Sequence, residues 1–206
     1  MNLLLLEDSD FTDPQHVRLS GRRLAHMQDI QQVSAGDTLR VGRINGLMGS
    51  GSVLELDSRS ALLRIELSEA PPAKLPLTLL LAMPRPKMFR RILQHCATLG
   101  VPEIILLNSY RVEKSFWQTP FLQPEAVRET LLRGLEQARD TRLPQVHLRP
   151  RFKPFVEDEL PALLQGKVGW TAHPVADAQP CPSAVPEPGV LAVGPEGGFI
   201  PYEVEQ

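Results

Sequence analysis

The amino-acid sequence predicts an α/β protein in two parts, a small β-rich domain followed by a domain built on a parallel sheet. Short strand-like stretches joined by turn residues fill the first third of the 206 residues. Residues 68–76 are then rich in proline, which favours an extended and fairly stiff linker. Beyond them, continuous apolar strands alternate with helical stretches, as they do around parallel sheets. We therefore expect one domain over residues 1–70 and a second over residues 77–206.

The first domain is predicted to be a small β-barrel with one short helix. Ser20 is a suitable N-cap for a helix from Gly21 to about Gln31. Asn45-Gly46 is a strong hairpin signal between strand-like stretches. The strands are expected at residues 2–6, 38–44, 52–56 and 61–67. Arg40 and Arg43 of such a barrel could contact RNA, and a purely structural barrel with scattered surface charge is an equally good interpretation.

The second domain is predicted to alternate buried strands with helices. Strands are expected at residues 77–82, 104–107, 146–148, 168–172 and 190–193. Helices are expected at residues 86–99, 124–139 and 155–164, and Gly100 is placed to end the first of them. Within that first helix, the apolar spacing predicts inward positions for Met88, Ile92, Leu93 and Cys96.

Composition excludes several classes of protein. A hydrophobic content of 42% and a charged content of 22% are ordinary for a soluble globular chain. No apolar run approaches the ~20 residues of a membrane helix, and the short run at residues 1–6 lacks the features of a secretory signal. Cys96 and Cys181 form neither a metal-binding spacing nor a disulfide framework, so a cytoplasmic location without bound metal is expected.

The net charge of −2 hides a strongly basic middle segment. Residues 85–153 hold 13 Lys and Arg against 6 Asp and Glu, whereas residues 154–206 hold 1 against 8. The forked guanidinium group of arginine matches the geometry of phosphate, so a partner that carries phosphates is a reasonable hypothesis. Solvated charges on helix surfaces are the alternative, and the acidic last segment could serve only to balance the middle one.

The last predicted strand breaks abruptly into the glycine-rich loop Gly194-Pro195-Glu196-Gly197-Gly198. Ligands of open parallel sheets bind at the carboxyl ends of the strands, and glycine lets backbone N–H groups approach them closely. Taken alone, the loop fits a simple turn as well as it fits a ligand site. It matches neither the Rossmann nor the Walker pattern, and the chain lacks the nucleophile elbow of hydrolases.

Polar loops follow three other predicted strands at the same edge of the sheet. They are Pro84-Arg85-Pro86-Lys87, the stretch 108–114 with Arg111 and Lys114, and Thr171-Ala172-His173-Pro174. The prolines of the first loop would hold its two cations rigidly, as a site for an anion requires. Each loop could equally be a connector with surface charge, and Phe116-Trp117 could stack on a base or, more often for such side chains, pack in the fold.

Three stretches together resemble the RsmE family of ribosomal RNA methyltransferases. They are Pro84-Arg85-Pro86-Lys87, Glu136-Gln137-Ala138-Arg139 and Val193-Gly194-Pro195-Glu196-Gly197-Gly198-Phe199, in this order after a small β domain. The resemblance implies an N-terminal PUA-like barrel for RNA and a C-terminal SPOUT domain with a deep trefoil knot. It also implies a homodimer that uses S-adenosylmethionine to methylate uridine N3 in 16S ribosomal RNA of the small ribosomal subunit.

The resemblance also implies roles for individual residues. The S-adenosylmethionine pocket is expected to involve Thr171, His173, Pro174, Leu191, Val193, Gly194, Pro195, Glu196, Gly197 and Gly198. The catalytic cations are expected to be Arg85, Arg111 and Arg139, one of which would stabilise the anion formed when uridine N3 loses its proton. Besides the barrel arginines, RNA contacts are expected from Lys87, Lys114 and Arg142. No general base is assigned; for Glu196 that role, cofactor binding and capping of the next turn stay open.

The family pattern continues beyond the glycine loop into a segment that completes the knot, whereas this sequence ends at Gln206. We expect either a fragment of a longer chain or a truncated molecule, and in the second case weak or absent cofactor binding. Two other functions remain open at this point. One is a non-catalytic RNA-binding module, and the other is a small-molecule α/β enzyme that holds a nucleotide on its glycine loop.

Overall fold

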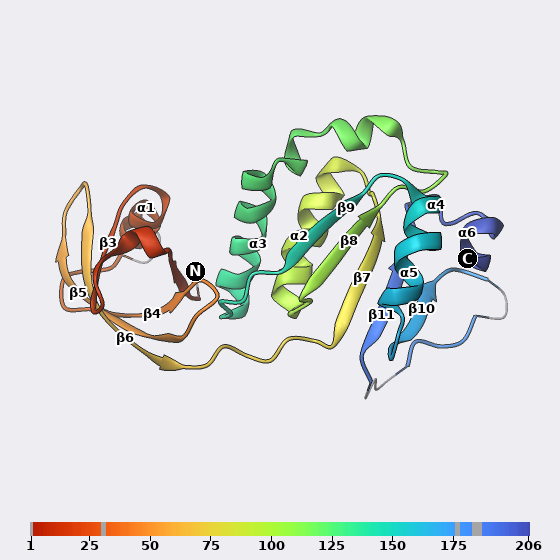
Figure 1. Cartoon of the computed structure of the whole chain (residues 1–206). Helices are drawn as coiled ribbons and strands as arrows, with labels where there is room; N and C mark the ends of the chain where they lie inside the picture. Colours follow the sequence, from red (N-terminus) through yellow and green to blue (C-terminus); the bar gives the residue numbers. More distant parts are fainter. Residues whose placement is uncertain (1, 30–31, 176–177, 183–186) are drawn as a thin grey trace. The chain divides into compact units, whose positions relative to one another are not determined.

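A computed structural model describes residues 2–29, 32–175, 178–182 and 187–206, and the chain divides into two compact units (Figure 1). The first unit comprises Met1–Ala73 and Leu132–Leu143, and the second comprises Lys74–Leu131 and Pro144–Gln206. The first change of unit along the chain, between Ala73 and Lys74, falls inside the proline-rich stretch. Nothing in the sequence predicted that residues 132–143 would group with the first unit.

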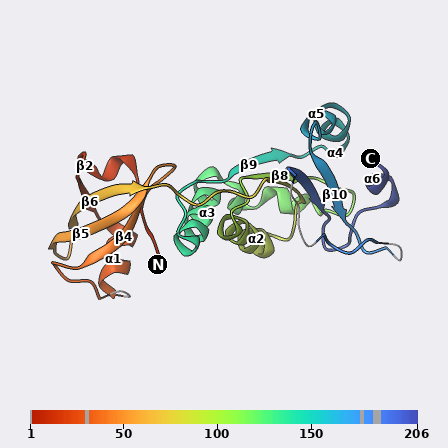
Figure 2. The same cartoon turned by 90° about the horizontal axis from the view of Figure 1, so that it is seen from below.

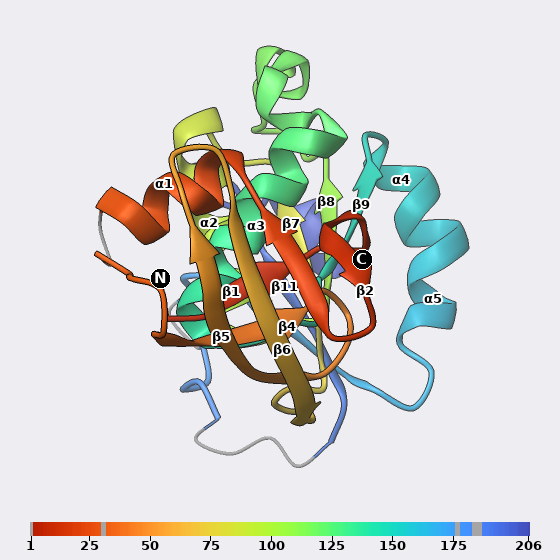
Figure 3. The same cartoon turned by 90° about the vertical axis from the view of Figure 1, so that its left-hand side faces the viewer.

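The first unit is built on a mixed six-stranded sheet with the order β1-β4-β5-β6-β3-β2 (Figure 3). Its strands are β1 (Leu4–Leu6), β2 (Phe11–Asp13), β3 (His16–Leu19), β4 (Thr38–Arg43), β5 (Met48–Leu56) and β6 (Ala61–Glu69). Only the β1–β4 pair is parallel. The sheet order places β1 and β2 at its two ends, so closure into a PUA-like barrel stays a prediction.

The predicted elements of this unit are present with altered bounds. Asn45 adopts a left-handed backbone with φ 59° in the hairpin between β4 and β5, as its sequence signal indicated. Strand β5 begins four residues earlier than expected, because glycine and serine hid its start. Strands β2 and β3, of three and four residues, were missed. Helix α1 (Gly21–Asp29) is confirmed, and its predicted end at residues 30–31 lies outside the described residues.

The core of the first unit is aliphatic and contains one buried ion pair. Apolar side chains from the strands and from Leu24 and Met27 of helix α1 form a single cluster. Asp10 ends the short 3-10 turn η1 (Asp8–Asp10) and is only 7% exposed. Both of its carboxylate oxygens accept hydrogen bonds from the guanidinium of Arg23, and the Glu7 N–H donates to it at 2.7 Å. This pair therefore joins helix α1 to the segment that follows β1.

Residues 132–143 are held to the first sheet by hydrogen bonds at the β4–β5 hairpin. The Asn45 N–H donates to the Thr141 carbonyl at 2.8 Å, and the Thr141 hydroxyl donates to the Gly46 carbonyl at 2.6 Å. In return, the Leu143 N–H donates to the side-chain oxygen of Asn45 at 2.9 Å. A further ion pair of 2.9 Å joins Arg22 to the buried carboxylate of Glu136. These contacts explain why this segment groups with the first unit.

The second unit is built on a five-stranded sheet, and every adjacent pair in its order β10-β11-β7-β8-β9 is parallel. Its strands are β7 (Leu77–Ala82), β8 (Glu103–Leu107), β9 (Gln145–Arg149), β10 (Val168–Ala172) and β11 (Gly189–Val193). The α/β class and the parallel sheet are thereby confirmed. The last strand, β11, lies between β10 and β7, inside the sheet rather than at its edge.

Helices lie on both faces of this sheet (Figure 2). Helix α2 (Pro86–Leu99) covers one face, and the continuous helical segment of α4 (Phe152–Pro154), the π-helical turn η4 (Phe155–Glu159) and α5 (Leu160–Leu163) covers the other. The remaining helical elements are η2 (Lys114–Gln118), η3 (Pro120–Leu122), α6 (Pro201–Glu205) and the first part of α3 (Pro124–Ala138), whose residues from Leu132 onward group with the first unit. The predicted helix at 155–164 thus begins earlier, at Phe152, and is not regular throughout.

Helix α2 has the predicted bounds but a different inward face. Gly100 ends it in a left-handed conformation with φ 79°. Met88 was expected inside and is 40% exposed, whereas its neighbour Phe89 is fully buried. Phe89, Leu93 and Cys96 recur at intervals of four and three residues, so the helix presents this set to the sheet. Burial raises the pKa of the Cys96 thiol to about 11, so this side chain is a protonated packing group at neutral pH.

The two ion pairs near η1 give a matched test of how the first unit is stabilised. We expect Asp10→Ala to lower the free energy of unfolding by about 3–5 kcal/mol, because it leaves the mostly buried Arg23 without its partner. Asp8→Ala removes an exposed pair with Arg43 and should cost less than about 1 kcal/mol. Urea denaturation of both variants measures the difference, and equal losses would contradict the assignment.

Candidate functional site

The loops after β7 and β11 meet at the carboxyl edge of the parallel sheet. Strand β7 has β8 on one side and β11 on the other, so two loops that are far apart in the sequence leave neighbouring strands at this edge. Ligands of open α/β sheets bind outside the carboxyl ends of the strands. The Arg85 N–H, at the start of helix α2, donates to Glu196 of the glycine loop at 3.2 Å. Glu196 therefore joins the two loops directly.

The glycine loop lies against the side chain of Arg111. The Arg111 guanidinium donates a hydrogen bond to the Gly197 carbonyl. A Cβ atom on Gly197 would lie only 3.2 Å from Arg111 Cδ, so a larger residue would press on this side chain. Gly198 has a φ of +73°, a conformation that favours glycine, and its N–H donates to the Pro195 carbonyl at 2.8 Å. The glycine loop is thus a tight turn, and its Gly197 carbonyl binds the loop that follows β8 and contains Arg111 (the Arg111 loop).

A buried carboxylate that the sequence analysis missed, Glu203 on α6, also belongs to this cluster. It is 9% exposed, and its two oxygens accept the Tyr110 N–H at 2.7 Å and the Ile200 N–H at 3.0 Å. A signal for it was present: Glu203 is the third residue of a helix that starts with Pro201, where a carboxylate commonly bonds back to the backbone before the helix. The contact with Tyr110 had no such signal.

An open groove lies beside these loops, along the sheet face of β10 and β11. Its volume is about 930 Å³, and its lining includes Trp170, Leu191 and Val204 together with Thr171, His173 and Pro174. The ring of Trp170 occupies the space that a side chain at Gly189 would need, since a Cβ there would lie 1.9 Å from the ring. The groove is largely apolar, so it suits a ligand with a flat or aliphatic body.

Two buried polar atoms at this edge lack a hydrogen-bond partner among the described residues. They are Ser109 Oγ, on a residue that is 3% exposed, and His173 Nδ1. Burying a polar group without a partner is costly, and such groups are rare in native proteins. Both residues follow strands of the sheet, and His173 Cε1 is 3.8 Å from the position of a Cβ on Gly198. His173 is therefore placed to bond a polar ligand next to the glycine loop, and Ser109 Oγ offers a second unpartnered group on the loop that follows β8.

Most of the residues predicted from the sequence to form one site are brought together in the second unit. Thr171, His173, Pro174 and Leu191 line the groove, and Glu196 and Gly197 contact the arginine loops. Val193 ends β11, and Gly194 and Pro195 follow it directly. Lys87 and Lys114 are exposed at the starts of α2 and η2. Which of these residues bind a ligand stays a prediction.

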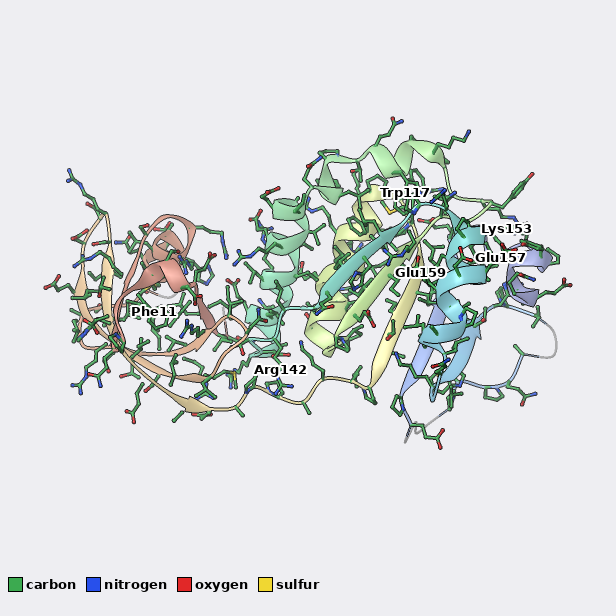
Figure 4. The ribbon with its side chains drawn as sticks, in the orientation of Figure 1. Phe11, Trp117, Arg142, Lys153, Glu157 and Glu159 are labelled. Atoms are coloured by element: carbon green, nitrogen blue, oxygen red, sulfur yellow. The ribbon has the colours of Figure 1, made fainter. Side chains whose placement is uncertain are left out.

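The other predicted residues, Arg40, Arg43, Arg139 and Arg142, belong to the first unit. Arg139 follows helix α3 in a left-handed conformation with φ 55°, and Arg142 is exposed in the same segment (Figure 4). Arg40 forms an ion pair with Glu69, which holds the pKa of that carboxyl below its ordinary value. Arg43 pairs with Asp8 at 2.8 Å and lies 5.2 Å from the centre of the Phe11 ring.

Trp117, one of two aromatic residues considered for base stacking, takes part in the fold. Its indole N–H donates to the side-chain oxygen of Asn108 at 2.9 Å, and the ring is half-buried (Figure 4). This supports the packing interpretation for Trp117. In the described part of the chain, no group of three or more His, Cys, Asp or Glu side chains is arranged to hold a metal ion. Nor do the described residues include a helix with the length and apolar character that crossing a membrane requires.

Comparison with known proteins identifies the class to which this fold and site belong. Residues 71–206 match the RNA methyltransferase domain family, so the chain is a member of that family. The ribosomal RNA small subunit methyltransferase E of Treponema pallidum is 32% identical over 159 residues, which cover 75% of this chain and 59% of that protein. The protein of the same name from Synechocystis is 28% identical over 192 residues, which cover 91% and 62%. The RsmE resemblance is therefore confirmed.

A solved structure supports the fold independently. The ribosomal RNA small subunit methyltransferase E from Neisseria gonorrhoeae, bound to S-adenosyl methionine, superposes with a TM-score of 0.74 at 18% identity. The match covers 100% of this chain and 84% of that one. At this level of identity the likeness bears on the fold alone. The chain spans about three fifths of the length of the Treponema and Synechocystis relatives.

The unpartnered hydroxyl of Ser109 predicts that its removal does not destabilise the protein. Ser109→Ala should leave the free energy of unfolding unchanged or raise it by up to about 1 kcal/mol, because it removes a buried polar group without a partner among the described residues. Thr130→Val is the control, since the Thr130 hydroxyl is buried and donates to the Ala126 carbonyl at 2.8 Å. That variant should lose about 1 kcal/mol. Thermal denaturation measures both, and a clear loss for Ser109→Ala would mean that the hydroxyl has a partner.

Proposed function

We propose that this protein methylates ribosomal RNA of the small ribosomal subunit with S-adenosylmethionine as the methyl donor, and that the methylated atom is uridine N3. The observation that carries the proposal is the junction at the carboxyl edge of the parallel sheet, where Glu196 and Gly197 bind the Arg85 and Arg111 loops beside an apolar groove. Membership of the RNA methyltransferase family and the names of the relatives support it.

The residues at this edge of the sheet fit the methyl donor chemically. The apolar groove suits the adenine and aliphatic parts of such a molecule, and Ser109 Oγ and His173 Nδ1 suit its polar groups. Gly197 and Gly198 permit close approach of the backbone. When bound, S-adenosylmethionine supplies a methyl group on a positively charged sulfur, which makes that carbon electrophilic. The proposed S-adenosylmethionine site thus combines predicted residues with Ser109, whose role was not predicted.

The arginines at the edge would serve the RNA side of the reaction. Uridine N3 becomes a good nucleophile only when it loses its proton, and a nearby cation stabilises the resulting anion. Arg111 suits this role because its charge persists at any physiological pH. One of its N–H groups binds the Gly197 carbonyl, and a guanidinium has five N–H donors in all. The same side chain can therefore be anchored to the loop and still bind the base.

The substrate would be held mainly through its phosphates. The excess of Lys and Arg over residues 85–153 suits a polyanionic partner, and Lys87 and Lys114 of this segment are exposed. Arg139 and Arg142, together with Arg40 and Arg43 of the first unit, are proposed as further contacts. A PUA-like role for the first unit, a knotted second unit, a homodimer and a cytoplasmic location complete the proposal.

Analysis of ribosomal RNA from cells that lack the gene tests the function. We expect one 3-methyluridine to disappear from 16S ribosomal RNA, as measured by mass spectrometry of its nucleosides. The wild-type gene should restore the modification, and a gene encoding Arg111→Ala should restore less than about a tenth of it, as expected for loss of a transition-state contact. Unchanged modification in the deletion strain would favour a non-catalytic RNA-binding module. Absence of salt-dependent RNA binding would favour a small-molecule enzyme.

Binding of the methyl donor can be measured separately by calorimetric titration. Ser109→Ala and His173→Ala should each weaken the affinity for S-adenosylmethionine about tenfold, or ~1.4 kcal/mol, because each removes one hydrogen-bonding group from the site. Lys153→Ala is the control, since Lys153 pairs with Glu157 on the exposed side of the α4–η4 segment (Figure 4). Unchanged affinity in both site variants would place the methyl donor elsewhere.

A further inference from the structure

We infer that Glu203 is a positioning residue, which holds Arg111 in place against the glycine loop. This inference rests on the proposed function, in which Arg111 binds the target base. Glu203 lies on α6, which follows the glycine loop. Among the described residues, Glu203 neither lines the groove nor contacts Ser109 Oγ or His173 Nδ1. Its effect on the reaction would pass through the backbone of Tyr110 and so through the neighbouring Arg111.

The contacts of Glu203 close a ring of three segments. One carboxylate oxygen accepts the Tyr110 N–H at 2.7 Å, and Tyr110 directly precedes Arg111. The Arg111 side chain donates to the Gly197 carbonyl, and the chain then runs through Gly198 and Phe199 to Ile200. The Ile200 N–H donates to the second carboxylate oxygen at 3.0 Å. The Arg111 loop, the glycine loop and α6 therefore restrain one another.

A carboxylate is the side chain that this ring requires. An ionised carboxylate only accepts hydrogen bonds, so it can serve two N–H donors from separate segments at once. Hydrogen bonds to a charged group are also stronger than neutral ones, and more so in a buried position such as this. Glutamine would keep one acceptor and turn an NH₂ group toward the other donor. A side chain at Gly197 would press on this ring, because its Cβ would lie 3.2 Å from Arg111 Cδ.

Positioning through Arg111 predicts a particular pattern in mutant kinetics. Glu203→Ala should lower kcat at least about tenfold while the KM for RNA changes less than about twofold, because a misplaced transition-state contact affects the rate more than binding. In an Arg111→Ala background, the same change should cost less than about twofold, because the group that Glu203 positions is already gone. Glu205→Ala removes an exposed acid from the same helix and should leave kcat unchanged.

A double-mutant cycle with purified protein, S-adenosylmethionine and 16S ribosomal RNA or small subunits tests this pattern. If Glu203→Ala again costs about tenfold in the Arg111→Ala background, the two residues act independently and the inference is wrong. Should Glu203→Ala fail to fold, Glu203→Gln takes its place in the cycle, with a smaller loss expected in the wild-type background and none without Arg111.

Hydrogen exchange of the Tyr110 amide separates a failure of this inference from a failure of the proposed function. Exchange should be at least about tenfold faster in Glu203→Ala and unchanged in Glu205→Ala, because only Glu203 protects that N–H. If the wild-type protein shows no methyl transfer, the proposed function falls, and exchange still decides whether Glu203 holds the Arg111 loop. Unchanged exchange in Glu203→Ala would overturn the inference whatever the activity.

Discussion

The shared direction of five strands is the constraint on which the rest of the second unit depends. Because β7, β8, β9, β10 and β11 are parallel and in register, every loop that follows them begins at the same edge. Residues more than a hundred positions apart, such as Arg85 and Glu196, thereby reach hydrogen-bonding distance. Insertion of β11 between β10 and β7 then places the glycine loop beside the loop that follows β7. A site at this edge follows from topology before any side chain is considered.

Two carboxylates at this edge, Glu196 and Glu203, bind the backbone of neighbouring loops. Glu196 accepts the Arg85 N–H, and Glu203 accepts the N–H groups of Tyr110 and Ile200. Composition alone suggested that the acidic residues of the last segment only balance the charge of the basic middle segment. Two of them, Glu196 and Glu203, instead join loops. In the contacts of the described residues, the guanidinium of Arg111 binds the Gly197 carbonyl rather than a carboxylate. That arrangement preserves positive charge where an anionic substrate would bind.

The sequence was most informative where local chemistry decides the structure. Gly100 ends α2 and Asn45 forms the hairpin, because each has the backbone freedom that its position requires. The burial of α2 was predicted less well, since Met88 and Phe89 are both apolar and only packing against the sheet selects Phe89. The contact between Glu203 and Tyr110 could not be read from the sequence, because it joins positions 93 residues apart. The same limit hid the association of residues 132–143 with the first unit.

The arginines of the first unit illustrate how ion pairs bear on a proposed RNA surface. Arg40 and Arg43 already bind Glu69 and Asp8, which at first suggests that they have no capacity for phosphate. Exposed pairs of this kind contribute about 0–1 kcal/mol, however, whereas phosphate contacts gain from release of the counterions around RNA. Replacing the carboxylate partner of Arg40 or Arg43 by an RNA phosphate therefore costs little free energy. The buried pair of Arg23 and Asp10 is different, since its loss would leave charges unpaired inside the fold, and it is structural.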